Sequence, residues 1–414
     1  MSNIESSDIW SVVSGGITAP NGFMASGVSA GFKPSVKLDL AVILAPPDTI
    51  CAATFTQSAV RAKCIDLCLQ RLSKQDGKIR AVLINSGQAN ACTGARGLDD
   101  SLLATKALAK QLALAEDEVV ICSTGVIGVP IPMQKLLQGI EPLVNCLSPE
   151  GGADAAQAIL TTDLVDKQIA ISVNLGGRHV CIGGMAKGSG MIHPNMATML
   201  GFLTCDASLP KDVWDEMIQN TVNCSFNSIS VDGDTSTNDS FLAFASGELL
   251  DEVYFEQVQS GINIVANFLA KTIARDGEGA NCLIEVKVDG AKDKKDANII
   301  ARHICNSSLV KTAVHGCDPN WGRIIAAAGS AGINFRLDEV SLWVGPFKLM
   351  ENGIPVAFNK EEVVKYMKQS LDATNLQENT IHLHLIVGKG NYSSIAWGCD
   401  LSSQYVHINA DYTT

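Results

Sequence analysis

The chain has 414 residues, of which 46% are hydrophobic and 18% are charged, so it holds ample material for a large packed core. Its 31 Lys and Arg residues against 43 Asp and Glu residues give a net charge of −12, which argues against nucleic acid or an anionic membrane as the main partner. No apolar run approaches the ~18 residues that span a bilayer. The polar start, MSNIESSDIW, resembles neither a secretory signal nor a basic transit peptide.

In the first half of the chain, the apolar patterns predict mainly strands. Short runs rich in branched residues predict buried strands at 38–45, 79–84 and 118–122. Residues 168–175 and 178–182 flank Gly176 and Gly177, which predicts a hairpin with a glycine turn. A helix is expected at 99–114, where apolar residues recur every three or four positions.

The second half of the chain mixes helical and strand patterns. Helices are predicted at 211–224, directly after Pro210, and at 256–275. Alternating apolar and polar residues predict half-buried strands at 282–288, 340–348 and 381–387. Together the elements predict a mixed α and β fold of the α+β class, in which hairpins accompany the helices, rather than a doubly wound sheet.

Thirteen cysteines are scattered from Cys51 to Cys399, with an odd total and no Cys-x-x-Cys pair. A chain of this length does not need disulfides to hold a core together. We therefore expect buried, reduced thiols and a cytoplasmic protein.

Seven glycine-rich, polar segments match no regular element and are candidates for binding or catalysis. They are NSGQANACTG (85–94), CSTGVIGVP (122–130), GGMAKGSGMIHPNMATML (183–200), VDGDTSTND (231–239), RDGEGA (275–280), GCDPNWGR (316–323) and NADYTT (409–414). Each one alone is compatible with ordinary turn chemistry. Seven in one chain favour a site assembled from several loops.

Two common phosphate-binding motifs are absent from the sequence. It contains no G-x-x-x-x-G-K-[ST] and no G-x-G-x-x-G. His382 and His384 would share one face of a strand, but no third ligand lies near them in sequence, so a polar strand face is favoured over a metal site. A Ser-His-Asp triad stays open, although no spacing points to one. We expect neither a metal nor a cofactor.

Thr198 is the best remaining nucleophile, because it follows a glycine-rich stretch and precedes an apolar segment. An N-terminal threonine supplies both a hydroxyl nucleophile and a base, its own α-amino group, whose unperturbed pKa is ~8. An internal threonine gains that amine only if the chain is cut in front of it. On the residues alone, a buried structural threonine remains the stronger interpretation.

The segment KGSGMIHPNMATML closely resembles the self-cleavage segment of the ornithine acetyltransferases, the glutamate N-acetyltransferases of arginine biosynthesis. The resemblance extends in order through NSGQANACTG, STGVIGVP, TTD, SFNSISVDGDTSTND, RDGEGA, DPNWGR, AWGCDL and INADYTT. It covers nearly the whole chain. It implies a layered sandwich of sheets flanked by helices, in the superfamily of certain N-terminal-nucleophile aminopeptidases.

The resemblance also implies a reaction. The chain would cut itself between Ala197 and Thr198 into an α chain, 1–197, and a β chain, 198–414, that share one active site. Thr198 would then take the acetyl group from N2-acetylornithine as an ester and pass it to glutamate in a double displacement, with acetyl-CoA as a possible second donor. Two such heterodimers would form an α2β2 assembly.

Site residues follow from the matched motifs. Thr124 and Gly125 would form the oxyanion hole, which needs donors aimed at the tetrahedral oxygen. The remaining substrate-binding positions are Thr161 or Thr162 (the sequence does not separate the pair), Lys187, Glu278, Asn409 and Thr414. Two other classes stay open: an amidase or aminopeptidase that uses water as the acceptor, and a non-catalytic protein that keeps the fold.

Overall fold

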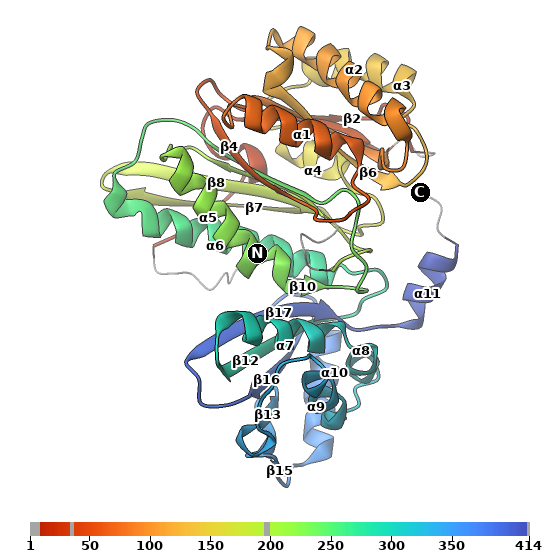
Figure 1. Ribbon diagram of the computed structural model, residues 1–414, viewed down its shortest axis with the longest axis vertical. Helices are drawn as coiled ribbons and strands as arrows, with labels where there is room; N and C mark the ends of the chain where they lie inside the picture. Colours follow the sequence, from red (N-terminus) through yellow and green to blue (C-terminus); the bar gives the residue numbers. More distant parts are fainter. Residues whose placement is uncertain (1–8, 34–36, 194–198, 412–414) are drawn as a thin grey trace.

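Three β-sheets organise the protein (Figure 1). The structure, a computed structural model, describes residues 9–33, 37–193 and 199–411. The six-stranded sheet runs, in spatial order, β1 (Ser11–Val13), β7 (Lys167–Leu175), β8 (Arg178–Lys187), β9 (Leu200–Cys205), β11 (Ser240–Ala245) and β4 (Ile50–Phe55). The four-stranded sheet runs β2 (Met24–Val28), β3 (Leu40–Leu44), β5 (Ala81–Gln88) and β6 (Val119–Val126).

These two sheets pack face to face and are covered by helices on both outer faces. The side chains of β3 alternate between the two faces of its sheet. Ala41 and Ile43 belong to the core between the sheets, whereas Leu40 and Val42 face the helices. The four-stranded sheet is covered by α1 (Lys63–Lys74), α2 (Gly94–Leu112) and α3 (Met133–Asn145). The six-stranded sheet is covered by α5 (Lys211–Cys224) and α6 (Phe255–Arg275), and α4 (Gly152–Ala158) adds to the middle core.

A third sheet forms the lower half of the molecule (Figure 1). Its order is β10 (Ile229–Ser230), β17 (Tyr392–Cys399), β12 (Leu283–Ala291), β16 (Thr380–Ile386), β13 (Ser341–Val344), β14 (Phe347–Glu351) and β15 (Ile354–Pro355). Its own core includes residues of α7 (Lys294–Asn306), α8 (Ser308–His315), α9 (Trp321–Gly329) and α10 (Lys360–Asp372). The last helix, α11 (Ser403–Ala410), leads the chain back toward the upper half. Single 3₁₀ turns lie at Gly16–Thr18, Glu116–Glu118, Phe226–Ser228, Glu252–Tyr254 and Leu337–Glu339.

The predicted fold class, a mixed α and β protein with sheets flanked by helices, is confirmed. Helix α5 has the predicted bounds, and β7 and β8 form the predicted antiparallel hairpin, with Gly176 and Gly177 at φ 59° and 87° in its turn. Among the described residues, no helix combines the length and the apolar character that crossing a membrane requires.

Two predictions of local structure were wrong. Residues 340–348 form two strands instead of one, because Gly345 takes φ 55° and Pro346 cannot donate a backbone hydrogen bond, so the chain reverses there. Several glycine-rich segments also continue regular elements: Asn85 to Gln88 extend β5 and Ser123 to Val126 extend β6. Strand β8 likewise runs through Gly183 and Gly184 to Lys187, and α11 includes Asn409.

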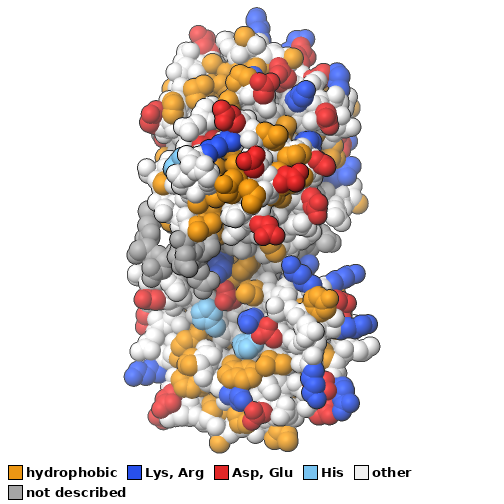
Figure 2. Space-filling view, turned by 90° about the vertical axis from the view of Figure 1, so that its left-hand side faces the viewer, with side chains coloured by type: hydrophobic (Ala, Val, Ile, Leu, Met, Phe, Trp, Pro, Cys, Tyr) orange, Lys and Arg blue, Asp and Glu red, His pale blue; other side chains and the backbone are white. Residues whose placement is uncertain are grey.

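The surface charge is mixed on the face that Figure 2 shows, and the cysteines are free thiols, as the sequence predicts. Figure 2 shows Lys and Arg side chains mixed with Asp and Glu side chains over one face, and the described residues of that face gather no large basic area. All thirteen cysteines are free thiols, and ten of them are buried.

Candidate active site

Three of the predicted site residues meet at the ammonium group of Lys187, the last residue of β8. Its Nζ donates to Thr161 Oγ1 at 2.6 Å and to Thr124 Oγ1 at 3.3 Å. Thr124 lies near the end of β6, so the contact joins the two sheets of the sandwich. The Lys187 side chain is only 6% exposed, and burial lowers its pKa below the ordinary lysine value.

The position after Thr124 must be a glycine. Gly125 has φ 128°, and a Cβ there would lie 2.3 Å from the carbonyl carbon of Gly87 on the neighbouring strand β5. Any larger residue would push the two strands apart. The Thr124 hydroxyl accepts a hydrogen bond from Lys187, so its own O–H remains available as a donor.

A buried cluster of charged side chains lies next to the Lys187 ammonium. Lys167 donates to Asp163 Oδ1 and to Asp276 Oδ2, both at 2.7 Å, and Asp163 Oδ2 lies 3.8 Å from Lys187 Nζ. The side chains of Lys167 and Asp163 are fully buried. Burial alone would raise the pKa of Asp163, but the ammonium groups of Lys187 and Lys167 outweigh burial and hold that pKa well below its usual range.

Glu278 and Asn409 form a second contact pair beside this cluster. Asn409 Nδ2, on α11, donates to Glu278 Oε2 at 2.8 Å. A Cβ on Gly190 would approach the Glu278 carboxyl carbon to 2.5 Å, so this glycine makes room for the carboxylate. The Glu278 N–H donates to the Ser189 carbonyl at 3.0 Å, which ties the pair to the segment that follows Lys187.

The described residues therefore bring together Thr124, Gly125, Thr161 and Lys187, and separately Glu278 with Asn409. Thr161 contacts Lys187, whereas Thr162 makes no side-chain hydrogen bond with the described part of the chain. The predicted nucleophile Thr198, its neighbour Ala197 and the predicted contact Thr414 lie outside the described residues.

Three aspartates near the site were not predicted from the sequence. Asp163 completes the quoted TTD, Asp276 lies inside RDGEGA, and Asp239 ends VDGDTSTND. Asp239 is fully buried, and its Oδ1 accepts the Met199 N–H at 3.1 Å, which anchors the start of the segment leading into β9. Burial raises the pKa of Asp239 well above its usual value. The sequence held a signal for these three residues, because each Asp lies in a motif that resembles the family.

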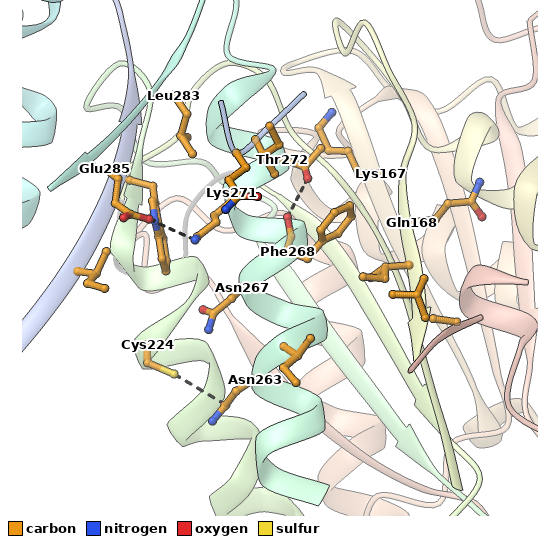
Figure 3. A pocket seen from close by; sticks show the side chains of 18 of the residues that line it. Lys167, Gln168, Cys224, Asn263, Asn267, Phe268, Lys271, Thr272, Leu283 and Glu285 are labelled. Carbon is orange, nitrogen blue, oxygen red and sulfur yellow. Dashed lines mark hydrogen bonds and ion pairs between the residues drawn. The ribbon is translucent and has the colours of Figure 1, made fainter. Parts of the chain in front are cut away.

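A wide groove elsewhere holds none of the predicted site residues. It has a volume of about 2090 Å³ and lies between the six-stranded and seven-stranded sheets, lined by side chains of α6, β7 and β12 (Figure 3). In this groove Lys271 Nζ forms an ion pair with Glu285 Oε2 at 3.2 Å. The groove shares with the site only Lys167, whose side chain is fully buried.

The two histidines of β16 make the contacts of a polar strand face. His382 Nδ1 lies 3.1 Å from Glu285 Oε1, and His384 Nε2 lies 2.7 Å from Asp289 Oδ2. His384 also stacks on Trp343. Each ring thus has a partner within the sheet.

The fold is a sandwich of two sheets flanked by helices. The site in it is a buried cluster of Lys187, at the end of β8, with the hydroxyls of Thr124 and Thr161. The sequence model of the ArgJ family matches residues 24–414, and the chain belongs to that family. "Arginine biosynthesis bifunctional protein ArgJ" of Prochlorococcus marinus (strain SARG) is 66% identical over 405 residues, 98% of each chain. The protein of that name from Synechococcus sp. (strain ATCC 27144) is 51% identical, over 98% of this chain and 99% of its own. A solved ornithine acetyltransferase from Mycobacterium tuberculosis, complexed with ornithine, is 40% identical over 45% of this chain and 98% of that chain, with a TM-score of 0.42.

Proposed function

We propose that this protein is an acetyltransferase of arginine biosynthesis that moves the acetyl group of N2-acetylornithine to glutamate through an acetyl ester on Thr198. The products are ornithine and N-acetylglutamate. Its relatives across the full length are named bifunctional proteins of arginine biosynthesis, which supports acetyl-CoA as a second donor. No cofactor takes part in the proposed chemistry, which uses only groups of the chain.

The observation that carries the proposal is the contact of Lys187 with Thr124 and Thr161. The three residues come from separate segments of the sequence, and each lies in a segment that resembles the family. A buried ammonium beside two hydroxyls suits a substrate that carries a carboxylate and develops negative charge during reaction.

Self-cleavage between Ala197 and Thr198 is part of the proposal, and the sheet supports it. Lys187 of β8 pairs with Leu200 of β9, so the scissile bond lies in the connection between two hydrogen-bonded antiparallel strands. After a cut there, β8 stays in the α chain and β9 in the β chain, and the ladder between them holds the two chains together. The Thr198 hydroxyl attacks the Ala197 carbonyl, the acyl group shifts from nitrogen to oxygen, and water hydrolyses the ester.

In the transfer reaction the freed α-amine of Thr198 accepts the hydroxyl proton as the oxygen attacks the acetyl carbonyl. Thr124 and Gly125 donate hydrogen bonds to the oxyanion, and the Lys187 ammonium polarises the Thr124 hydroxyl, which strengthens that bond. Ornithine leaves as an amine that takes up the proton. The amine of glutamate then attacks the ester and regenerates Thr198.

An assay of the purified protein with glutamate and either N2-acetylornithine or acetyl-CoA tests the function. We expect N-acetylglutamate from both donors. Acetate release that glutamate does not accelerate would instead indicate a hydrolase, and no turnover with either donor would refute the proposal.

Chain processing is tested on the same sample. We expect two chains on a denaturing gel, with Thr198 as the first residue of the second, because the nucleophile needs a free α-amine. A single intact chain that transfers acetyl at full rate would contradict the mechanism. Assembly as α2β2 and a cytoplasmic location, in which the thirteen thiols stay reduced, complete the proposal.

A further inference from the structure

Asp163 contacts more parts of the candidate site than any residue that the sequence assigns to it. Its Oδ1 accepts from Lys167 Nζ and from the Gly188 N–H, both at 2.7 Å. Its Oδ2 accepts from the Thr161 N–H at 3.0 Å and lies 3.8 Å from Lys187 Nζ. The side chain is fully buried, so a substrate has no open path to the carboxylate itself. Asp163 therefore acts through its neighbours.

We propose that Asp163 is the positioning residue of the site: its carboxylate holds the Lys187 ammonium and the Thr161 hydroxyl in the arrangement through which they act on the substrate. The inference rests on the proposed function, in which Lys187 and Thr161 serve acetyl transfer. The backbone N–H groups of Gly188 and Thr161 donate to the Asp163 carboxylate, which fixes the backbone next to Lys187 and at Thr161. The negative charge of Asp163 also compensates the buried ammonium of Lys187.

The surroundings of Lys187 make Asp163 its closest anionic partner. The charged groups near its ammonium are three that favour the charged form, Asp163, Glu278 and Asp239, and two cations, Lys167 and Lys33. Within the described chain, only Asp163 forms an ion pair with it. Burial lowers the pKa of Lys187, and Asp163 is the largest influence that raises it. Removing this carboxylate should therefore make Lys187 lose its proton at a lower pH.

The test compares Asp163→Asn with Asp276→Asn. Both substitutions remove one buried negative charge and keep the side-chain shape, and both residues bind Lys167, but only Asp163 forms an ion pair with Lys187. In protein labelled with ¹³Cε-lysine, the Lys187 resonance is assigned by its loss in Lys187→Arg. We expect the acid ionisation constant of Lys187 to rise about tenfold or more in Asp163→Asn. In Asp276→Asn we expect it to change less.

The alkaline limb of kcat for acetyl transfer should move to lower pH in Asp163→Asn together with the Lys187 titration. An unchanged Lys187 titration in a folded Asp163→Asn protein, or an equal change in Asp276→Asn, would overturn the inference. The titration does not require activity, so a protein without acetyl transfer would refute the proposed function and leave this result readable.

If Asp163→Asn does not fold, Asp163→Glu serves in its place. It keeps the charge and moves the oxygens by one methylene. We expect Lys187 to titrate close to the wild-type pH while kcat falls at least about tenfold, because small misplacements of reacting groups cost up to ~10²-fold. A wild-type kcat in this variant would also overturn the inference.

Discussion

Two clusters of charged side chains in this protein use the same residue types in very different surroundings. Below the candidate site, Lys167, Asp163 and Asp276 have side chains that are at most 7% exposed. On the seven-stranded sheet, Lys287 and Asp289 have side chains that are 48% and 27% exposed, and their ion pair measures 2.9 Å.

The difference shows what burial does to an ion pair. Water solvates a surface charge almost as well as its partner does, so a surface pair contributes little. A buried charge has given up its hydration, so it depends on its partner, and removing that partner is strongly destabilising. The buried cluster contacts the site through Lys187.

Lys167→Met should have the largest effect, because it leaves Asp163 and Asp276 buried without their shared cation. We expect a loss of about 3–5 kcal/mol in the free energy of unfolding, measured by urea denaturation. A loss below about 1 kcal/mol would mean that the buried cluster behaves like a surface pair and would break the comparison.

Thr124→Val extends the comparison to a neutral member of the buried group. It removes the proposed oxyanion donor and the hydroxyl that accepts from Lys187, while keeping the branched shape. Acetyl transfer should slow by ~10²–10³-fold, and self-cleavage should slow as well, because both steps pass through an oxyanion. Rates within a factor of about two of wild type would show that the oxyanion assignment is misplaced.

The acid dependence of stability extends the comparison to Glu285, a residue of the seven-stranded sheet whose side chain is 18% exposed. Burial alone would raise the pKa of Glu285, but contacts with His382, Lys271 and Trp397 lower it from 4.5 to about 2. A carboxyl whose pKa is lowered on folding stabilises the protein above the unfolded pKa, and this contribution is lost as the pH falls from 4.5 toward 2.

Glu285→Gln should therefore reduce the fall in the free energy of unfolding as the pH drops below 4.5. Urea denaturation at pH 7 and at successively lower pH values measures this slope. Equal slopes for the variant and the wild type would show that Glu285 keeps an ordinary pKa.

Lys287→Met is the matched surface counterpart of Lys167→Met and should have the smallest effect. Its partner Asp289 keeps a contact with His384 and remains accessible to water. We expect a change of less than about 1 kcal/mol in the free energy of unfolding. A loss as large as that of Lys167→Met would remove the distinction between the two clusters.

Much of the fold could be predicted from the sequence where one local pattern decided the structure. Helix α5 begins after Pro210 and carries a regular apolar face, and β7 and β8 are joined by two glycines. Local patterns failed where a neighbouring strand decided. Gly125 reads as a turn residue, yet it continues β6 because the backbone of Gly87 passes beside it.

The site was predictable through resemblance and only partly through chemistry. The motifs named Thr124, Thr161 and Lys187, but residues 124, 161 and 187 are far apart in the sequence, and no spacing rule brings their side chains together. Asp276 was overlooked because an Asp in a glycine-rich segment resembles a turn residue. Asp163 was overlooked because only the two threonines of TTD were considered as substrate contacts. Their role depends on burial, which arises only when the two sheets pack.

The central claim is that Thr198 carries the acetyl group between donor and acceptor. The most direct measurement is the mass of the chain containing Thr198 after incubation with N2-acetylornithine, before and after glutamate is added. We expect one added acetyl group, mapped to Thr198 and removed faster when glutamate is present, and no such group in Thr198→Ala. An acetyl group that forms in Thr198→Ala and passes to glutamate, or one whose loss glutamate does not accelerate, would contradict this account.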